Sequence, residues 1–117
     1  MLSFLKRLNG NAETTVAEVD PGEAQRRQQT GALLVDVREP DEWASGHAAG
    51  AVHIPLGQLP KRLHELPTDR EVLFICRSGR RSSSAANTAV AAGLGRVTNV
   101  RGGTIAWARA GLPVKAN

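Results

Sequence analysis

Short runs rich in apolar residues alternate along the chain with polar segments of helical character. The runs that predict strands cover residues 16–19, 32–37, 51–54, 72–75 and 97–100. The run 32–37 lacks regular polar alternation, which is typical of a strand buried on both faces, and 72–75 is the most apolar run of all. Strands that alternate with helices in this way predict a three-layer α/β domain with a mainly parallel sheet.

Capping residues and helix breakers delimit the segments between these strands. Asp20 and Pro21 predict a helix start, the polar run after them continues the helix, and Gly31 ends it. Further helices are predicted at residues 40–44, 59–66, 81–92 and 104–110, and a Gly or Pro follows each of them. We therefore expect one domain over residues 16–117, preceded by an N-terminal tail over residues 1–15.

The composition narrows the classes of function. One cysteine in 117 residues excludes an intramolecular disulfide and a zinc site built on several cysteines, and the three histidines show no metal-ligand spacing. We expect no metal, no cofactor and a reducing, cytoplasmic setting. No run approaches the roughly 20 apolar residues that span a bilayer, so we expect no stable membrane insertion.

The charge and the aromatic content bear on the kind of ligand. A net charge of +4 favours anionic ligands, but it does not choose among nucleic acid, a lipid surface and a small oxyanion. Two Trp, two Phe and no Tyr leave few aromatic side chains for stacking on bases. We therefore expect no nucleic-acid partner.

The only cysteine, Cys76, lies where the most apolar strand ends and a helix is about to begin. Ligands of open α/β sheets bind at such strand ends, and loop N–H groups together with a helix start favour an anion there. Arg77, Arg80 and Arg81 add positive charge, and Gly79 permits a backbone angle that a Cβ would penalise. These features predict a reactive cysteine with a depressed pKa, rather than a buried apolar residue that only ends a strand.

Four segments, in order, resemble the signatures of the rhodanese family, in which single-domain sulfurtransferases carry sulfane sulfur as a cysteine persulfide. They are residues 34–43 (LVDVREPDEW), 46–55 (GHAAGAVHIP), 76–82 (CRSGRRS) and 101–113 (RGGTIAWARAGLP). The resemblance covers roughly residues 16–114 and departs from the family pattern at Ala48 and Ala49, where Ile-Pro is usual. It implies a rhodanese-like domain, with a five-stranded parallel sheet and helices on both faces.

The same resemblance implies roles for the loop residues. Cys76 would be the nucleophile that carries the sulfur, and the loop would hold the bound sulfur and the oxyanion of the donor. The residues implied for substrate binding are Arg77, Ser78, Gly79, Arg80, Arg81 and Ser82. The implied partners are a small anionic sulfur donor such as thiosulfate and an acceptor, which is cyanide, a thiol or, in a sulfur relay, another protein.

Asp36 and Arg38 form a candidate pair that could support the loop mouth. We favour an internal ion pair that braces neighbouring turns, because structural networks commonly use such pairs. His47 is interpreted as a packed loop residue rather than a general acid or base. Trp43 and Trp107 are interpreted as core aromatics, given their helical settings.

The leading hypothesis is two-step covalent catalysis, in which the Cys76 thiolate takes sulfur from the donor and then passes it to the acceptor. A persulfide carrier or docking module that feeds another protein would use the same cysteine and remains an alternative. A cysteine-dependent phosphatase or arsenate reductase is less favoured. Its larger cradle places the arginine one position further along than Arg81, and this chain has Ser82 there.

Overall fold

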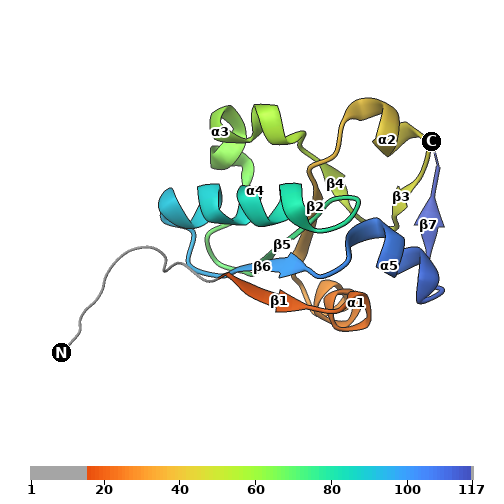
Figure 1. Cartoon of the computed structure of the whole chain (residues 1–117). Coiled ribbons are helices and arrows are strands. Elements are labelled where there is room, and N and C mark those ends of the chain that lie inside the picture. Colours follow the sequence, from red (N-terminus) through yellow and green to blue (C-terminus); the bar gives the residue numbers. More distant parts are fainter. Residues whose placement is uncertain (1–15, 117) are drawn as a thin grey trace.

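The fold is built on a parallel sheet, which the computed structural model describes within residues 16–116 (Figure 1). Across the sheet the order is β1 (Ala17–Val19), β6 (Val97–Val100), β5 (Val72–Ile75), β2 (Leu33–Asp36) and β4 (Val52–His53). All neighbouring strands run parallel. The expected five-stranded parallel sheet is confirmed, whereas the tail expected over residues 1–15 lies outside the described residues.

Helices cover both faces of this sheet, as expected (Figure 1). One face carries α1 (Pro21–Gln29) and α5 (Gly103–Arg109), and the other carries α3 (Leu59–Arg62) and α4 (Arg80–Ala91). The short helix α2 (Pro40–Ala44) lies beyond the end of β2. Within residues 16–116, no helix has both the length and the apolar character needed to cross a membrane.

The two faces of the sheet bury separate cores because neighbouring side chains of a strand point to opposite faces. Leu73 and Ile75 of β5 pack with Ala24 of α1 and with Trp107 of α5. The opposite core joins β5 to α4 and contains Val72, Phe74, Cys76, Ala85, Ala86 and Ala89. The alanines bring α4 close to β5, so the cysteine at the end of this central strand meets the start of the helix.

Two features differ from the sequence-based expectations. The helix predicted over 59–66 is shorter, because α3 is flanked by 3-10 turns at Leu56–Gln58 and Leu63–Glu65. Leu66 is extended, as is usual for a residue that precedes proline. A small antiparallel sheet was not predicted: β3 (His47–Ala48) pairs with β7 (Val114–Lys115), and strands of two residues carry too little pattern to detect.

Candidate active site

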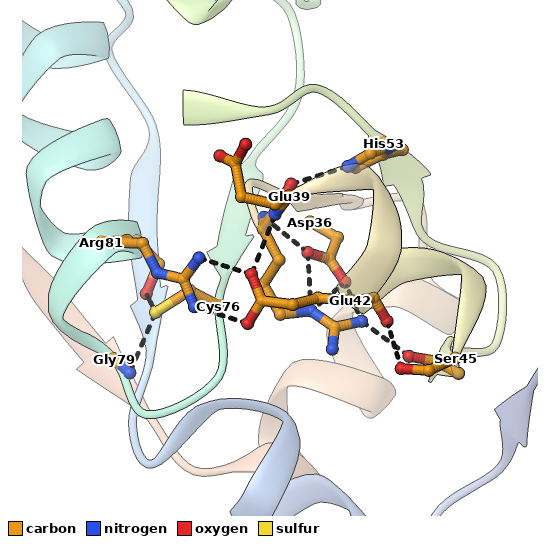
Figure 2. Close-up of polar contacts among 11 residues, drawn as sticks. Asp36, Glu39, Glu42, Ser45, His53, Cys76, Gly79 and Arg81 are labelled. Atoms are coloured by element: carbon orange, nitrogen blue, oxygen red, sulfur yellow. Dashed lines mark hydrogen bonds and ion pairs between the residues drawn. The ribbon is translucent and has the colours of Figure 1, made fainter. Parts of the chain in front are cut away.

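Cys76 directly follows β5, and the loop from Cys76 to Gly79 leads into α4. Gly79 has a φ of 112°, in the left-handed region that favours glycine. This turn aims the Gly79 N–H back at the strand end, where it donates to Sγ of Cys76 at 3.1 Å (Figure 2). Cys76 itself is only 1% exposed, so the loop encloses the sulfur.

Donor groups surround the Cys76 sulfur and act on its ionisation. Oγ of Ser82, in the first turn of α4, lies 3.3 Å from Sγ. Burial raises the pKa of the Cys76 thiol, but the hydrogen bonds offered by Ser82, Gly79 and Ser78 together outweigh burial. The pKa of Cys76 therefore lies below its ordinary value, in the direction that the sequence predicted.

The first residues of α5 hydrogen-bond to the backbone of the cysteine loop. The N–H groups of Thr104 and Ile105 donate to the carbonyls of Cys76 (2.8 Å) and Arg77 (3.2 Å). Gly103 has a φ of 61°, and a Cβ there would collide with these two carbonyl oxygens. Because the carbonyl groups of Cys76 and Arg77 are hydrogen-bonded to α5, the N–H groups of the loop can point toward the sulfur.

Ser82 connects the cysteine to a buried residue that the sequence pattern did not single out. Its Oγ lies 2.6 Å from Oδ1 of Asn99 on β6, and Asn99 Nδ2 donates to Glu18 Oε2 (3.0 Å) and to the Gly79 carbonyl (3.3 Å). Asn99 is 1% exposed. An amide at a buried position of a short strand was the available signal, and by itself it does not point to the loop.

Arg81 lies beside the loop, at the start of α4, and pairs with Glu42 of α2 (Figure 2). The Arg81 hydrogen bonds hold the pKa of Glu42 at about 2. Glu42 also accepts from the Glu39 N–H at 3.0 Å, so one carboxylate caps α2 and holds the arginine. Its place in the signature over residues 34–43 was the only sequence signal for Glu42.

Asp36 and Arg38 form a buried ion pair at the end of β2. Nη2 of Arg38 lies 2.8 Å from Oδ2 of Asp36 and 2.7 Å from the Gly46 carbonyl, and the Arg38 N–H donates to Oδ1 of Asp36. The pair thus braces two neighbouring turns, as the favoured interpretation had it. These contacts are with each other and with Gly46, and none is with the cysteine.

Trp43 stacks with two histidine rings. The ring centroids are 3.4 Å apart for His47 and 4.7 Å apart for His53. His47 is buried, with Nδ1 at 2.9 Å from the Trp43 carbonyl, so it is a packed residue as interpreted, although it lies in the short strand β3 and not in a loop. Trp107 is a core residue, but Trp43 is half-buried, so the core interpretation is wrong for Trp43. The reason is that α2 buries none of its residues.

A cavity of about 420 Å³ opens beside the loop, lined by Leu56, Ser78, Arg80, Arg81 and Ser84. Arg77 and Arg80 are exposed. A larger hollow of about 760 Å³ lies at the opposite ends of the strands, near Arg27 and Glu71, and no cysteine or histidine lines it. In the part of the chain that the structure describes, no group of three or more His, Cys, Asp or Glu could hold a metal ion.

Comparisons with known proteins agree with this geometry. A sulfurtransferase of Allochromatium vinosum is 50% identical over 84 residues, which are 72% of this chain and 78% of that protein. The thiosulfate sulfurtransferase GlpE of Pseudomonas syringae is 33% identical over 94 residues, 80% of this chain and 89% of that protein.

The fold is shared as well. The crystal structure of a rhodanese-related protein from Thermoplasma volcanium superimposes with a TM-score of 0.80 and 28% identity, over 86% of this chain and 99% of that chain. The family model of the rhodanese-like domain matches residues 20–110, nearly the whole of the described fold including the cysteine loop. The chain therefore belongs to the rhodanese-like family of sulfurtransferases.

Proposed function

We propose that the chain moves sulfane sulfur from a small anionic donor such as thiosulfate to cyanide or a thiol, through a persulfide on Cys76. The observation that carries the proposal is the surroundings of the sulfur. The Gly79 N–H and the Ser82 hydroxyl lie within 3.3 Å of Sγ, in a loop that can hold a negative charge at its centre. The relative from Pseudomonas syringae, whose name specifies thiosulfate, supports the choice of donor.

The first half-reaction loads the cysteine. The Cys76 thiolate attacks the outer sulfur of thiosulfate, a new S–S bond forms, and the S–S bond of thiosulfate breaks, so that sulfite leaves with the electron pair. The negative charge then lies on the terminal sulfur of the persulfide, where the loop N–H groups can hold it. The lowered pKa of Cys76 favours the thiolate, and a thiolate attacks sulfur without a general base.

The second half-reaction unloads it. Cyanide or a thiolate attacks the terminal sulfur, the S–S bond breaks, and Cys76 leaves as a thiolate, so that no external oxidant or reductant is consumed. Donor and acceptor thus react in turn at one sulfur, which predicts ping-pong kinetics. The arginines of the cysteine loop and the start of α4, which are Arg77, Arg80 and Arg81, would attract the oxyanion of the donor. Ser78 lines the cavity beside the loop.

The short loop supports a sulfur species rather than a phosphate. Arg81 is in the first turn of α4, and the loop N–H groups already lie close to Sγ. A tetrahedral phosphate presents three peripheral oxygens to the cradle, whereas a persulfide presents one terminal sulfur. The ring of N–H groups would have to widen before it could surround a phosphate.

A protein acceptor would use the same persulfide, and the free thiol of Cys76 suits a reducing compartment such as the cytoplasm. Turnover separates the two roles. An enzyme turns over thiosulfate and cyanide many times at low protein concentration. A dedicated carrier accepts one sulfur atom and releases it only when its partner protein is present.

Intact mass spectrometry after exposure to thiosulfate tests the proposal. The protein should gain the mass of one sulfur atom, and cyanide or dithiothreitol should remove it. Cys76→Ser should show neither the adduct nor turnover, while Ser45→Ala at the C-terminal end of α2 should behave as the wild type. Sulfurtransferase activity in the Cys76→Ser protein would refute the assignment.

A further inference from the structure

The Ser82 hydroxyl has a single proton and two acceptors within reach. Oγ lies 2.6 Å from Oδ1 of Asn99 and 3.3 Å from Sγ of Cys76. A hydroxyl donates only one hydrogen bond at a time, although it can accept others. Ser82 and Asn99 are 0% and 1% exposed, so bulk water does not replace a partner that either of them loses.

The amide of Asn99 can point only one way. Its two N–H groups meet the Glu18 carboxylate at 3.0 Å and the Gly79 carbonyl at 3.3 Å, and both of these groups only accept. A flipped amide would bring its own oxygen against these two acceptors. Oδ1 of Asn99 therefore faces Ser82, and because Oδ1 also only accepts, the Ser82 proton is the one that satisfies it.

We propose that Asn99 is a positioning residue, which holds the hydroxyl proton of Ser82 away from Cys76 and so sets how readily the cysteine ionises. In the thiol form every group is satisfied, because S–H donates to Oγ of Ser82 and Ser82 donates to Oδ1 of Asn99. The thiolate can only accept. If the Ser82 proton turns to the sulfur, Oδ1 of Asn99 is left buried without a donor, which is costly.

In the persulfide form, Cys76 and Asn99 do not compete for the Ser82 proton. This consequence rests on the proposed function. Sγ of a persulfide carries no proton, and the negative charge lies on the terminal sulfur. The hydrogen bond from Ser82 to Asn99 can then persist unchanged. Asn99 thus opposes the bare thiolate without opposing the persulfide, which favours retention of the sulfur until an acceptor arrives.

Charged groups also lie on the loop and on the elements packed around it. They are Arg77 and Arg80 in the loop, Arg81 of α4 with Glu42 of α2, the Asp36–Arg38 pair at the end of β2, and Glu18 of β1 with Arg101 after β6. Replacing Asn99 releases one partner of Glu18. The effect of Ser82→Ala is therefore measured separately with Asn99 present and with Asn99→Leu. The altered environment of Glu18 cancels within the second comparison, because both of its proteins carry Asn99→Leu.

The test is a double-mutant cycle of Ser82→Ala and Asn99→Leu, read out as the pH midpoint of Cys76 ionisation. Thiolate ultraviolet absorbance and the rate of iodoacetamide alkylation both report this midpoint. The chain has one cysteine and no tyrosine, so no other thiolate and no tyrosinate contributes. Neither readout requires sulfur transfer.

The expected result is a strong coupling between the two positions. Asn99→Leu frees the Ser82 proton for the sulfur and should lower the midpoint by about one pH unit, the size of one hydrogen bond to a charged acceptor. Ser82→Ala should then raise the midpoint by about one unit in the Asn99→Leu background, and by less than about half a unit in the wild type. Equal shifts in the two backgrounds would overturn the proposal.

Two comparisons keep the test decisive. If Asn99→Leu does not fold, Ser82→Ala alone decides, because a rise of more than about half a unit would mean that the hydroxyl already donates to the sulfur. Thr98→Val is the matched control, since Thr98 is a buried polar residue of the same strand that bonds to Glu71 instead. A Thr98→Val shift as large as that of Asn99→Leu would also overturn the proposal.

The two proposals can fail separately. A coupled cycle in a protein that takes no sulfur from thiosulfate would refute the proposed function and leave the role of Asn99 standing. Equal Ser82→Ala shifts in a protein that forms the persulfide normally would refute the role of Asn99 alone.

Discussion

Arg81 binds Glu42 through two parallel hydrogen bonds, with Nη1 at 2.6 Å from Oε1 and Nη2 at 2.9 Å from Oε2. Such bidentate pairs fix the relative orientation of the two side chains and also stabilise the folded protein. This one joins α2 to the start of α4, so it holds the segments 34–43 and 76–82 together beside the cysteine. The guanidinium is therefore held in place before any donor arrives.

Replacement of Glu42 by Gln should destabilise the protein by about 1–2 kcal/mol at neutral pH, less than a fully buried pair because both side chains are partly exposed. The folded pKa of Glu42 is about 2, below its ordinary 4.5, so the stabilisation is present above pH 4.5 and is lost as the pH falls toward 2. Urea unfolding at pH 7 and near pH 2 measures both. Glu65→Gln, at a more exposed pair with Arg62, is the control and should cost less. A Glu42→Gln deficit that is the same at both pH values would contradict the prediction.

The arginines of the loop mouth should govern donor affinity. Arg77→Gln and Arg80→Gln should each raise KM for thiosulfate by roughly threefold to tenfold, since exposed charges contribute less than desolvated ones. Arg81→Gln should raise KM and also lower stability, because it breaks the pair with Glu42. Steady-state kinetics and urea unfolding separate the two effects, with the distant and exposed Arg26→Gln as control. Unchanged KM values in all three loop variants would leave these arginines without a role in donor binding.

Alkylation of Cys76 should show a midpoint below the ordinary thiol pKa of 9.0. The hydrogen bonds that overcome burial exist only in the folded loop, so unfolding in urea should return the midpoint to its ordinary value. The iodoacetamide rate against pH, in buffer and in urea, makes this comparison within one chain. A native midpoint at or above the urea value would show that burial outweighs the hydrogen bonds.

One glycine inserted after Gly79 should abolish sulfur loading, because it moves the loop N–H groups away from Sγ of Cys76. The unmodified protein should hydrolyse an aryl phosphate no faster than Cys76→Ser does. Both properties are measured by intact mass and by release of the aryl alcohol. Cysteine-dependent phosphatase activity in the parent, with no persulfide from thiosulfate, would favour the phosphatase alternative.

Alanine at Gly103 should disrupt the loop more than alanine at another glycine with positive φ. Gly111 has a φ of 74° and open space around its Cα, so Gly111→Ala reports the backbone strain alone, about 1 kcal/mol. Gly103→Ala adds a collision with the carbonyls of Cys76 and Arg77, and should lower both stability and sulfur loading further. Thermal unfolding and intact mass provide the comparison. Equal losses of stability and of sulfur loading in Gly103→Ala and Gly111→Ala would mean that the backbone shifts to avoid the collision without loss of stability.

Features set by local pattern were predictable from the sequence, and features set by long-range register were not. The apolar run 72–75, the breakers around it and the position of Cys76 predicted the central strand and the loop. Asn99 and Glu18 meet only because β1 pairs with β6 in a register that places Glu18 opposite Asn99. No local signal carries that register, and the same holds for Arg81 and Glu42, which are 39 residues apart.

The backbone contact at Gly103 means that the cysteine loop is not a portable motif. A graft of residues 76–82 onto another strand–helix junction would transfer the nucleophile, the arginines and the serine. It would leave behind the N–H groups of Thr104 and Ile105, which fix the carbonyls of Cys76 and Arg77 from the far end of the chain. Transplanting sulfur chemistry from this protein therefore requires the C-terminal helix as well as the loop.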